Sequence, residues 1–281
     1  MEDSPLSFCH DQSVGRQLKA VFSQPTKQLK SNIMKLQNKI AVITGGNSGI
    51  GLAAAHEFKA QGARVIIIGR KPDAVAVAAK EIGGDTLGLV ADVAQVADLE
   101  RAFQEIRKQA GHIDILFANA GVAKFAPLAE VTEEFFLEQT SINVKGAYFT
   151  AQKALPLLTE GASIIFTSST VSHFGMPGSS VYSMTKAALI NLAKTLAVEL
   201  AGKKIRVNVV SPGPISTPIF SKMGLPEAAV QELGGAILAQ VPLARFGEAW
   251  EIAKAVAYLA SSDAAYVTGT ELLVDGGMAQ Q

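Results

Sequence analysis

The chain has 281 residues, of which 48% are hydrophobic and 18% are charged, so it can bury a sizeable core. Its 25 basic and 25 acidic residues cancel, which argues against nucleic acid or an anionic membrane as a partner and favours small molecules. The only cysteine, Cys9, excludes an intramolecular disulfide and a cysteine-built zinc site, and this usage fits a reducing cytoplasm.

Residues 1–33 are polar and carry no hydrophobic period, so we expect a disordered N-terminal extension ahead of one domain spanning 34–281. They lack the apolar core of a secretory signal, and no apolar run of the chain reaches membrane-spanning length. Basic residues such as Arg16 leave a transit peptide open, although Glu2 and Asp3 oppose it. Met34 is an alternative start of the functional protein.

From Lys39 onward, short β-branched runs alternate with longer Ala-rich segments of helical period. The expected strands are Ile40–Thr44, Arg64–Ile68, Thr86–Val90, Ile113–Ala118, Ser163–Thr167, Arg206–Val210 and Glu271–Val274. The expected helices are Gly51–Gln61, Asp73–Glu81, Val96–Ala110, Glu133–Leu158, Ser180–Ala201 and Ala249–Leu259. This alternation predicts one doubly wound α/β domain of the Rossmann type, a seven-stranded parallel sheet with helices on both faces.

The segment 214–245 interrupts this alternation with a mixture of proline, glycine and apolar residues. Such a composition favours short helices in an insertion. Because the insertion follows the carboxyl end of a strand, where doubly wound folds bind ligands, we expect it to form a lid over the substrate.

The first expected strand runs into a glycine-rich turn, Thr44–Gly51, and an Ala-rich helix follows it. Glycine permits the sharp turn, lets the backbone approach a pyrophosphate and allows the helix to pack close to the strand. The unpaired N–H groups of the helix N-terminus then face the anion. The strand before this turn and the helix after it indicate a dinucleotide site.

The tip of the second expected strand selects between cofactors, because a carboxylate there would repel a 2′-phosphate. The tip instead reads Ile68-Gly69-Arg70-Lys71, which favours NADP(H) over NAD(H) without excluding the latter. Arg70 and Lys71 could instead be solvated turn residues. After the third strand, Asp92 could bind the adenine edge or cap the next helix.

Tyr182 and Lys186 are four residues apart in a segment of helical period, so both project from one helix face. An adjacent ammonium, together with an oxidised nicotinamide, would lower the pKa of the tyrosine toward neutrality. The alternative is a surface helix with an exposed lysine. Several other polar and glycine residues would converge with this pair at the carboxyl edge of the sheet. They are Ser168, Ser169, Asn119, Ala120, Gly121 and Asn143.

From about Lys35 to Gly277, these motifs resemble the classical short-chain dehydrogenase/reductase family, including its 3-oxoacyl-[acyl-carrier-protein] reductase-like members. The resemblance implies a catalytic tetrad of Asn143, Ser169, Tyr182 and Lys186, and favours Ser169 over Ser168 because of its distance from the tyrosine. It departs from the family at Ala118, where a second asparagine is frequent. The resemblance and the turns described above assign the cofactor to Gly45, Asn47, Ser48, Gly49, Ile50, Gly51, Arg70, Asp92, Val93, Asn119, Ala120, Gly121, Tyr182, Lys186, Pro212, Gly213, Ile215 and Thr217.

The family mechanism implies hydride transfer between NADP(H) and a carbonyl or secondary alcohol, with Tyr182 as the general acid and base. Ser169 would bind the substrate oxygen, Lys186 the nicotinamide ribose, and Asn143 a water that relays protons. No metal is required. The competing interpretations are an extended-type epimerase or dehydratase and a non-catalytic NADP(H)-binding regulatory protein.

The substrate is not evident from the sequence, since an apolar pocket suits ketones, steroids, acyl thioesters or quinones. Its expected wall comprises Phe125, His173, Phe174, Met176, Ile219, Phe220, Met223 and Leu225. An acidic turn at Thr159–Gly161 argues against docking of a carrier protein, and Lys203 and Lys204 compensate only in part. The family resemblance also implies a homotetramer built on the helices Glu133–Leu158 and Ser180–Ala201.

Overall fold

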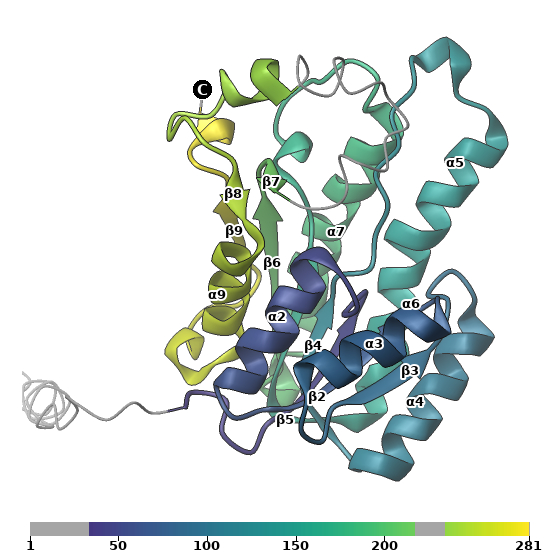
Figure 1. The fold of residues 1–281 in the computed structure, drawn as a ribbon, viewed down its shortest axis with the longest axis vertical. Coiled ribbons are helices and arrows are strands. Elements are labelled where there is room, and N and C mark those ends of the chain that lie inside the picture. The colour runs from purple at the N-terminus through teal and green to yellow at the C-terminus, as the bar shows by residue number, and fades with distance from the viewer. Residues whose placement is uncertain (1–33, 217–233, 281) are drawn as a thin grey trace, which may run out of the picture. The chain divides into compact units, whose positions relative to one another are not determined.

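The computed structural model describes residues 34–216 and 234–280. A seven-stranded sheet, in the order β3-β2-β1-β4-β5-β6-β9, forms the centre of this part of the chain (Figure 1). All neighbouring strands are parallel, which confirms the predicted doubly wound sheet. The strands are β1 Ile40–Thr44, β2 Arg64–Gly69, β3 Leu87–Val90, β4 Ile113–Ala118, β5 Leu158–Thr167, β6 Arg206–Pro212 and β9 Glu271–Val274.

Helices cover both faces of the sheet, each over its own apolar cluster. Helices α2, α3 and α9 cover one face, and α4, α6 and α7 cover the other (Figure 1). The longer α-helices of the described residues are α2 Gly49–Ala60, α3 Pro72–Ile82, α4 Val96–Ala110, α5 Glu133–Thr140, α6 Ala147–Ala154, α7 Ser180–Glu199 and α9 Ala249–Ala260. None of the helices in the described ranges is long and apolar enough to cross a membrane.

The region Glu133–Leu158 is not the single α-helix that the sequence predicts. Between α5 and α6 lies a π-helical segment, η2 (Ser141–Gly146), and α6 is followed by a 3₁₀ turn, η3 (Leu155–Leu157). Pro156 lacks an N–H and cannot continue the α-helical bonding, so β5 already begins at Leu158. Segments of π-helix inside α-helices are frequent at functional sites. The segment η2 contains Asn143, which the sequence analysis placed in the catalytic tetrad.

The predicted insertion is only partly described. The two-residue strand β7 (Ile215–Ser216) pairs with β8 (Gly247–Glu248), and residues 234–238 are helical. A capping box of Glu248 and Glu251 starts α9, and the Arg245 guanidinium binds both oxygens of Glu251 at 2.7 Å. Residues 217–233 lie outside the described residues, as do residues 1–33, so the lid and the N-terminal extension stay predictions.

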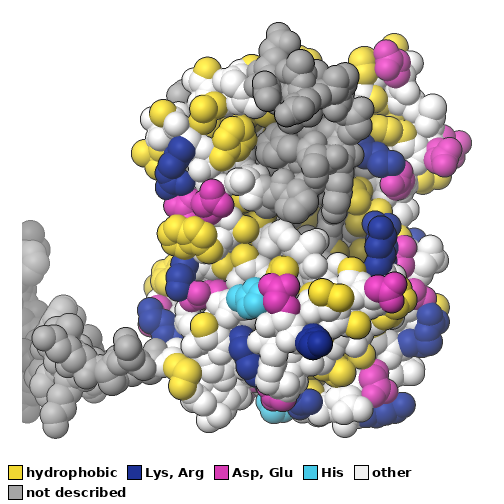
Figure 2. Space-filling model, in the orientation of Figure 1, with side chains coloured by type: hydrophobic (Ala, Val, Ile, Leu, Met, Phe, Trp, Pro, Cys, Tyr) yellow, Lys and Arg dark blue, Asp and Glu magenta, His cyan; other side chains and the backbone are white. Residues whose placement is uncertain are grey.

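Charged side chains of both signs are interspersed on the face shown in Figure 2. The basic and acidic totals of the sequence are equal, and on this face the two signs also alternate locally. Several exposed pairs are ion pairs, such as Lys204 with Glu160 at 2.6 Å. Pairs of this kind contribute little to stability, because water already solvates both charges.

Candidate active site

The glycine-rich turn joins β1 to α2 by close approach of the backbone. A Cβ on Gly51 would lie 2.2 Å from the Gly45 carbonyl oxygen, so only glycine fits there. Gly49 adopts a left-handed φ of 53°, which also favours glycine. The first turn of α2 contains no acidic residue, and the Ser48 side chain does not cap the helix. The N-terminus of α2 can therefore receive an anion from outside the chain.

The strand tip after β2 presents Arg70 and Lys71 to solvent. No carboxylate in the described part of the chain pairs with Arg70. A Cβ on Gly69 would lie 2.5 Å from Asn47 Oδ1 and 2.8 Å from a Val75 methyl group. An acidic side chain at position 69 would therefore displace both neighbours, and the described part of the chain offers neither Arg70 nor Lys71 an ion-pair partner.

The Asp92 side chain forms a local turn and does not cap the next helix, whose N-cap residue is Gln95. Its Oδ1 accepts the Ala94 N–H at 2.9 Å, while its own N–H donates to Asp98 Oδ2 at 3.1 Å. The adjacent Val93 is buried, and its side chain lies against Gly146 in η2. The turn after β3 is thereby held against the helix that carries Asn143.

Asn119 ties three strand ends together at the carboxyl edge of the sheet. The N–H groups of Asn119 and Ala120 both donate to Thr44 Oγ1 at 3.1 Å. The Asn119 side chain donates to the Thr44 carbonyl at 3.1 Å and accepts from Thr167 Oγ1 at 3.3 Å. Its side-chain bonds are thus within the protein, so contact with the cofactor would involve the backbone here.

Lys186 is buried one turn beyond Tyr182 on α7, with 4% of its surface exposed. Its ammonium lies 5.7 Å from the centre of the Tyr182 ring and donates to the Thr167 carbonyl at 2.8 Å. Burial lowers the pKa of Lys186 to about 8. A Cβ on Gly121 would come within 3.3 Å of this ammonium, so the glycine leaves room for it. This lysine is a buried member of the site and not an exposed surface residue.

Burial raises the pKa of Tyr182 above its usual value, and the nearby Ser169 side chain offsets this rise only in part. The protein's own groups therefore raise the pKa of Tyr182, and Lys186 is not among the causes of the shift. Ser168 is buried and donates to the Lys186 carbonyl at 2.9 Å, so Ser169 is the serine that faces the phenol.

Asn143, in η2, has no exposed surface, and its side chain is fully engaged. Its Oδ1 accepts the Val122 N–H at 2.8 Å, and its Nδ2 donates to the Val122 carbonyl at 2.9 Å and to Thr185 Oγ1 at 3.0 Å. A water relay at Asn143 would therefore use its backbone and not its side chain. Sequence reasoning missed Thr185, which also donates to the Tyr182 carbonyl at 2.7 Å.

Of the residues expected to line the apolar pocket, Phe125 contacts the phenol. Phe125 packs edge-on against Tyr182, with ring centres 5.7 Å apart and planes inclined by 70°. His173 was expected in the pocket wall, but its Nε2 lies 2.7 Å from a Glu271 oxygen on β9. Phe174 and Met176 are partly buried on the same loop. The expected site residues Thr217, Ile219, Phe220, Met223 and Leu225 lie outside the described residues.

At the end of β6, Pro212 is buried and Gly213 lies against Asp275, where a Cβ would approach the Asp275 backbone to 2.7 Å. The Ile215 side chain is buried in the apolar cluster under α9, so only its backbone can reach a ligand. Within the described ranges, no three His, Cys, Asp or Glu side chains gather as metal ligands do.

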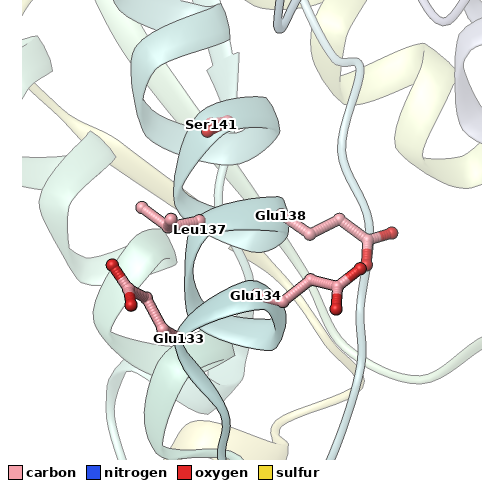
Figure 3. A pocket seen from close by; sticks show the side chains of 5 residues that line it. All are labelled: Glu133, Glu134, Leu137, Glu138 and Ser141. Carbon is pink, nitrogen blue, oxygen red and sulfur yellow. The ribbon is translucent and has the colours of Figure 1, made fainter.

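A surface hollow on α5 is separate from this site. It is lined by Glu133, Glu134, Leu137, Glu138 and Ser141, and none of the tetrad residues borders it. Figure 3 shows Glu134 and Glu138 leaving the helix on one side, with Glu133 and Leu137 on the other. It therefore contributes nothing to the constellation around Tyr182.

Residues 45–279 match the family model described as Enoyl-(Acyl carrier protein) reductase. The chain is 41% identical over 253 residues to oxidoreductase asL5 of Sarocladium schorii, covering 89% of this chain and 99% of that protein. It is 36% identical over 250 residues to the 3-oxoacyl-[acyl-carrier-protein] reductase FabG of Thermotoga maritima, with 87% and 99% covered.

Two solved structures are similar along nearly their whole length. A short-chain type dehydrogenase/reductase from Mycobacterium marinum superposes with a TM-score of 0.81 at 34% identity, covering 88% of this chain and 98% of that one. A blue fluorescent protein from a metagenomic library, in complex with NADPH, gives a TM-score of 0.81 at 32% identity, covering 87% and 99%.

Proposed function

The chain belongs to the short-chain dehydrogenase/reductase family of NAD(P)-dependent oxidoreductases, and on this premise we propose that it transfers a hydride between NADP(H) and a carbonyl or secondary alcohol. The observation that carries the proposal is the buried Lys186 ammonium 5.7 Å from the centre of the Tyr182 ring, with the Ser169 side chain near enough to the phenol to lower its pKa. These groups occupy the carboxyl edge of the sheet, close to the glycine-rich turn.

The residues present fit a dinucleotide. The backbone cradle at Gly51, which a Cβ would fill, suits a pyrophosphate at the N-terminus of α2. Lys186 would bind the nicotinamide ribose, and Pro212 and Gly213 would line the nicotinamide end. When bound, the cofactor supplies or accepts the hydride.

The protein's own groups manage the proton. In reduction, Ser169 donates a hydrogen bond to the substrate oxygen, and Tyr182 passes its proton to that oxygen. The raised pKa of Tyr182 keeps the phenol protonated at neutral pH, which suits a general acid. In oxidation the steps reverse, and the charge of Lys186 stabilises the phenolate.

We infer a preference for NADP(H) from the exposed and unpaired Arg70. A guanidinium can bind a 2′-phosphate through two hydrogen bonds, and no carboxylate at this strand tip repels it. Asn47 and Ser48 add no second cation in the turn, so NAD(H) is also accepted, with lower affinity. The complex of one structural relative with NADPH supports this proposal.

The substrate class we propose is a carbonyl compound with an apolar neighbourhood, because the Phe125 ring borders the phenol. We give Glu160 and Lys204 no weight in proposing whether a carrier protein docks. They lie at the amino ends of β5 and β6, on the edge of the sheet opposite the site. An acyl thioester, which the relatives' names suggest, therefore remains among the proposed substrates.

We also propose a cytoplasmic homotetramer. Large apolar side chains are exposed on the helices that the family resemblance places between subunits, and a partner copy would cover them. They are Leu137 on α5, Tyr148 on α6, and Met184 and Val198 on α7. Light scattering that gave a stable monomer at micromolar concentration would contradict this assembly.

The test of the activity is a panel of ketones, quinones, steroids and acyl thioesters with NADPH deuterated at the reactive carbon. Deuterium in the alcohol product, with loss of cofactor absorbance, is expected for at least one class. Tight NADPH binding without transfer to any member would instead support the non-catalytic regulatory protein.

A further inference from the structure

The loop after β4 carries Phe125, and backbone hydrogen bonds hold it at alternate residues. Val122 is bound by the Asn143 side chain, and the Ala126 N–H donates to the Gly178 carbonyl at 2.9 Å. Between them, the Lys124 N–H donates to the side-chain Oε1 of Gln139 at 3.0 Å. Phe125 therefore sits between two anchored residues.

Gln139 is an unusual occupant of its position. It lies on α5 with no exposed surface, and its Nε2 has no hydrogen-bond partner among the described residues. A buried amide with an unpaired N–H is unfavourable, and an apolar residue of similar size would avoid the cost. The one hydrogen bond of the Gln139 side chain among the described residues is the bond that its Oε1 accepts from the Lys124 N–H.

Gln139 precedes Asn143 by one helical turn, and both side chains bind the same loop. Asn143 fixes the loop where it leaves β4. Gln139 fixes it beside Phe125, whose ring edge contacts Tyr182. Asn143 therefore holds the part of the loop near the tetrad, and Gln139 holds the part that carries Phe125.

We propose that Gln139 is a positioning residue for substrate selection, which holds the Lys124 backbone so that Phe125 borders the Tyr182 phenol. It does not contact the reacting atoms, so its loss should weaken substrate binding and leave proton transfer in place. This proposal rests on the proposed carbonyl reduction for its substrate effect, but the anchoring itself does not depend on any activity.

The test compares Gln139→Met, which removes the acceptor at nearly equal volume, with Gln139→Glu, which keeps an oxygen at that place. Glu138→Gln is the matched control, because it breaks the exposed ion pair of Glu138 with the Lys124 side chain and spares the backbone bond. Lys124→Pro removes the same bond from the loop side and serves if Gln139→Met does not fold.

For Gln139→Met we expect a rise in the substrate KM of about two- to tenfold, the effect of one neutral hydrogen bond on an equilibrium constant. We expect kcat and the NADPH Kd to stay near wild type, and Gln139→Glu and Glu138→Gln to retain the wild-type KM. Deuterium exchange at the Lys124 amide should quicken in Gln139→Met and stay slow in Glu138→Gln.

Unchanged exchange and KM in Gln139→Met would overturn the proposal, as would equal losses in Gln139→Met and Gln139→Glu. A uniform fall in kcat, cofactor affinity and melting temperature would also overturn it, because it would show a merely structural role. If the wild type reduces no carbonyl, the proposed function fails, and amide exchange alone decides whether Gln139 anchors the loop.

Discussion

The proposed nucleotide turn and the proposed catalytic cluster lie at the same sheet edge but are built in opposite ways. Around Gly51 and Gly69 the backbone provides the shape, and an added Cβ would collide with neighbouring atoms. Around Tyr182 and Lys186, side chains carry the proposed chemistry, and the Lys186 ammonium donates to the Thr167 carbonyl. Substitutions that add atoms should therefore impair the glycine-rich turn, and substitutions that remove a single polar atom should impair the cluster around Tyr182.

The largest effect is expected for Tyr182→Phe, which removes one oxygen from the catalytic cluster. Turnover should fall about a hundredfold or more, since the substrate oxygen loses its proton donor. The melting temperature and the NADPH Kd should stay close to wild type, because the ring and its contact with Phe125 remain. Steady-state kinetics and cofactor fluorescence titration measure these effects. Activity near wild type would remove Tyr182 from the mechanism.

Gly51→Ala is the corresponding change in the nucleotide turn. The new Cβ would lie 2.2 Å from a backbone oxygen, so the turn must open and α2 must shift. Overpacking of this kind costs about 1–3 kcal/mol of folding free energy. We expect a lower denaturation midpoint and weaker binding of both cofactors. Gly202→Ala, where a Cβ would meet no atom within 4 Å, is the control and should change neither.

In the nucleotide region, the side chain to which we assign the proposed cofactor preference is Arg70. Arg70→Ile should reduce the preference for NADPH over NADH by about ten- to a hundredfold, the effect of a charge-assisted bond to the 2′-phosphate. Position 69 should remain glycine, because a side chain there meets Asn47 and Val75. The ratio of the two kcat/KM values is the measurement, with Lys71→Ile as the control. A wild type that prefers NADH would refute this assignment.

The last prediction concerns the pH dependence of stability caused by Lys186. Burial lowers its pKa from 10.5 to about 8 in the folded protein. At pH values between 8 and 10.5, Lys186 is protonated in the unfolded chain and deprotonated in the folded protein. The unfolding free energy attributable to Lys186 should therefore rise with pH across this window, by at most about 1.4 kcal/mol per pH unit.

Urea unfolding of the wild type and of Lys186→Met at several pH values isolates this contribution. The difference between the two proteins should change between pH 8 and 10.5 and be constant below that window. A constant difference throughout would mean that the buried ammonium keeps its ordinary pKa.

The alternation of β-branched and Ala-rich segments was sufficient to predict the sheet, its parallel strands and most helix boundaries. Local backbone preferences and burial on two faces govern those features, and both can be recognised in short stretches of sequence. Where prediction failed, at Glu133–Leu158, the helix changes type beside the site. The π segment there carries Asn143, whose bonds to Val122 and Thr185 join residues distant in the sequence.

By itself, the sequence determined the fold class, the glycine-rich turn and the spacing of Tyr182 and Lys186, because each depends on neighbours along the chain. Only the tertiary structure decided which hydrogen bonds Ser168, Asn143 and His173 form. It also decided that burial raises the pKa of Tyr182 and that Gln139 binds the Phe125 loop. Hydrogen-bond partners and desolvation come from segments that meet only when the sheet and helices pack, and no local pattern specifies them.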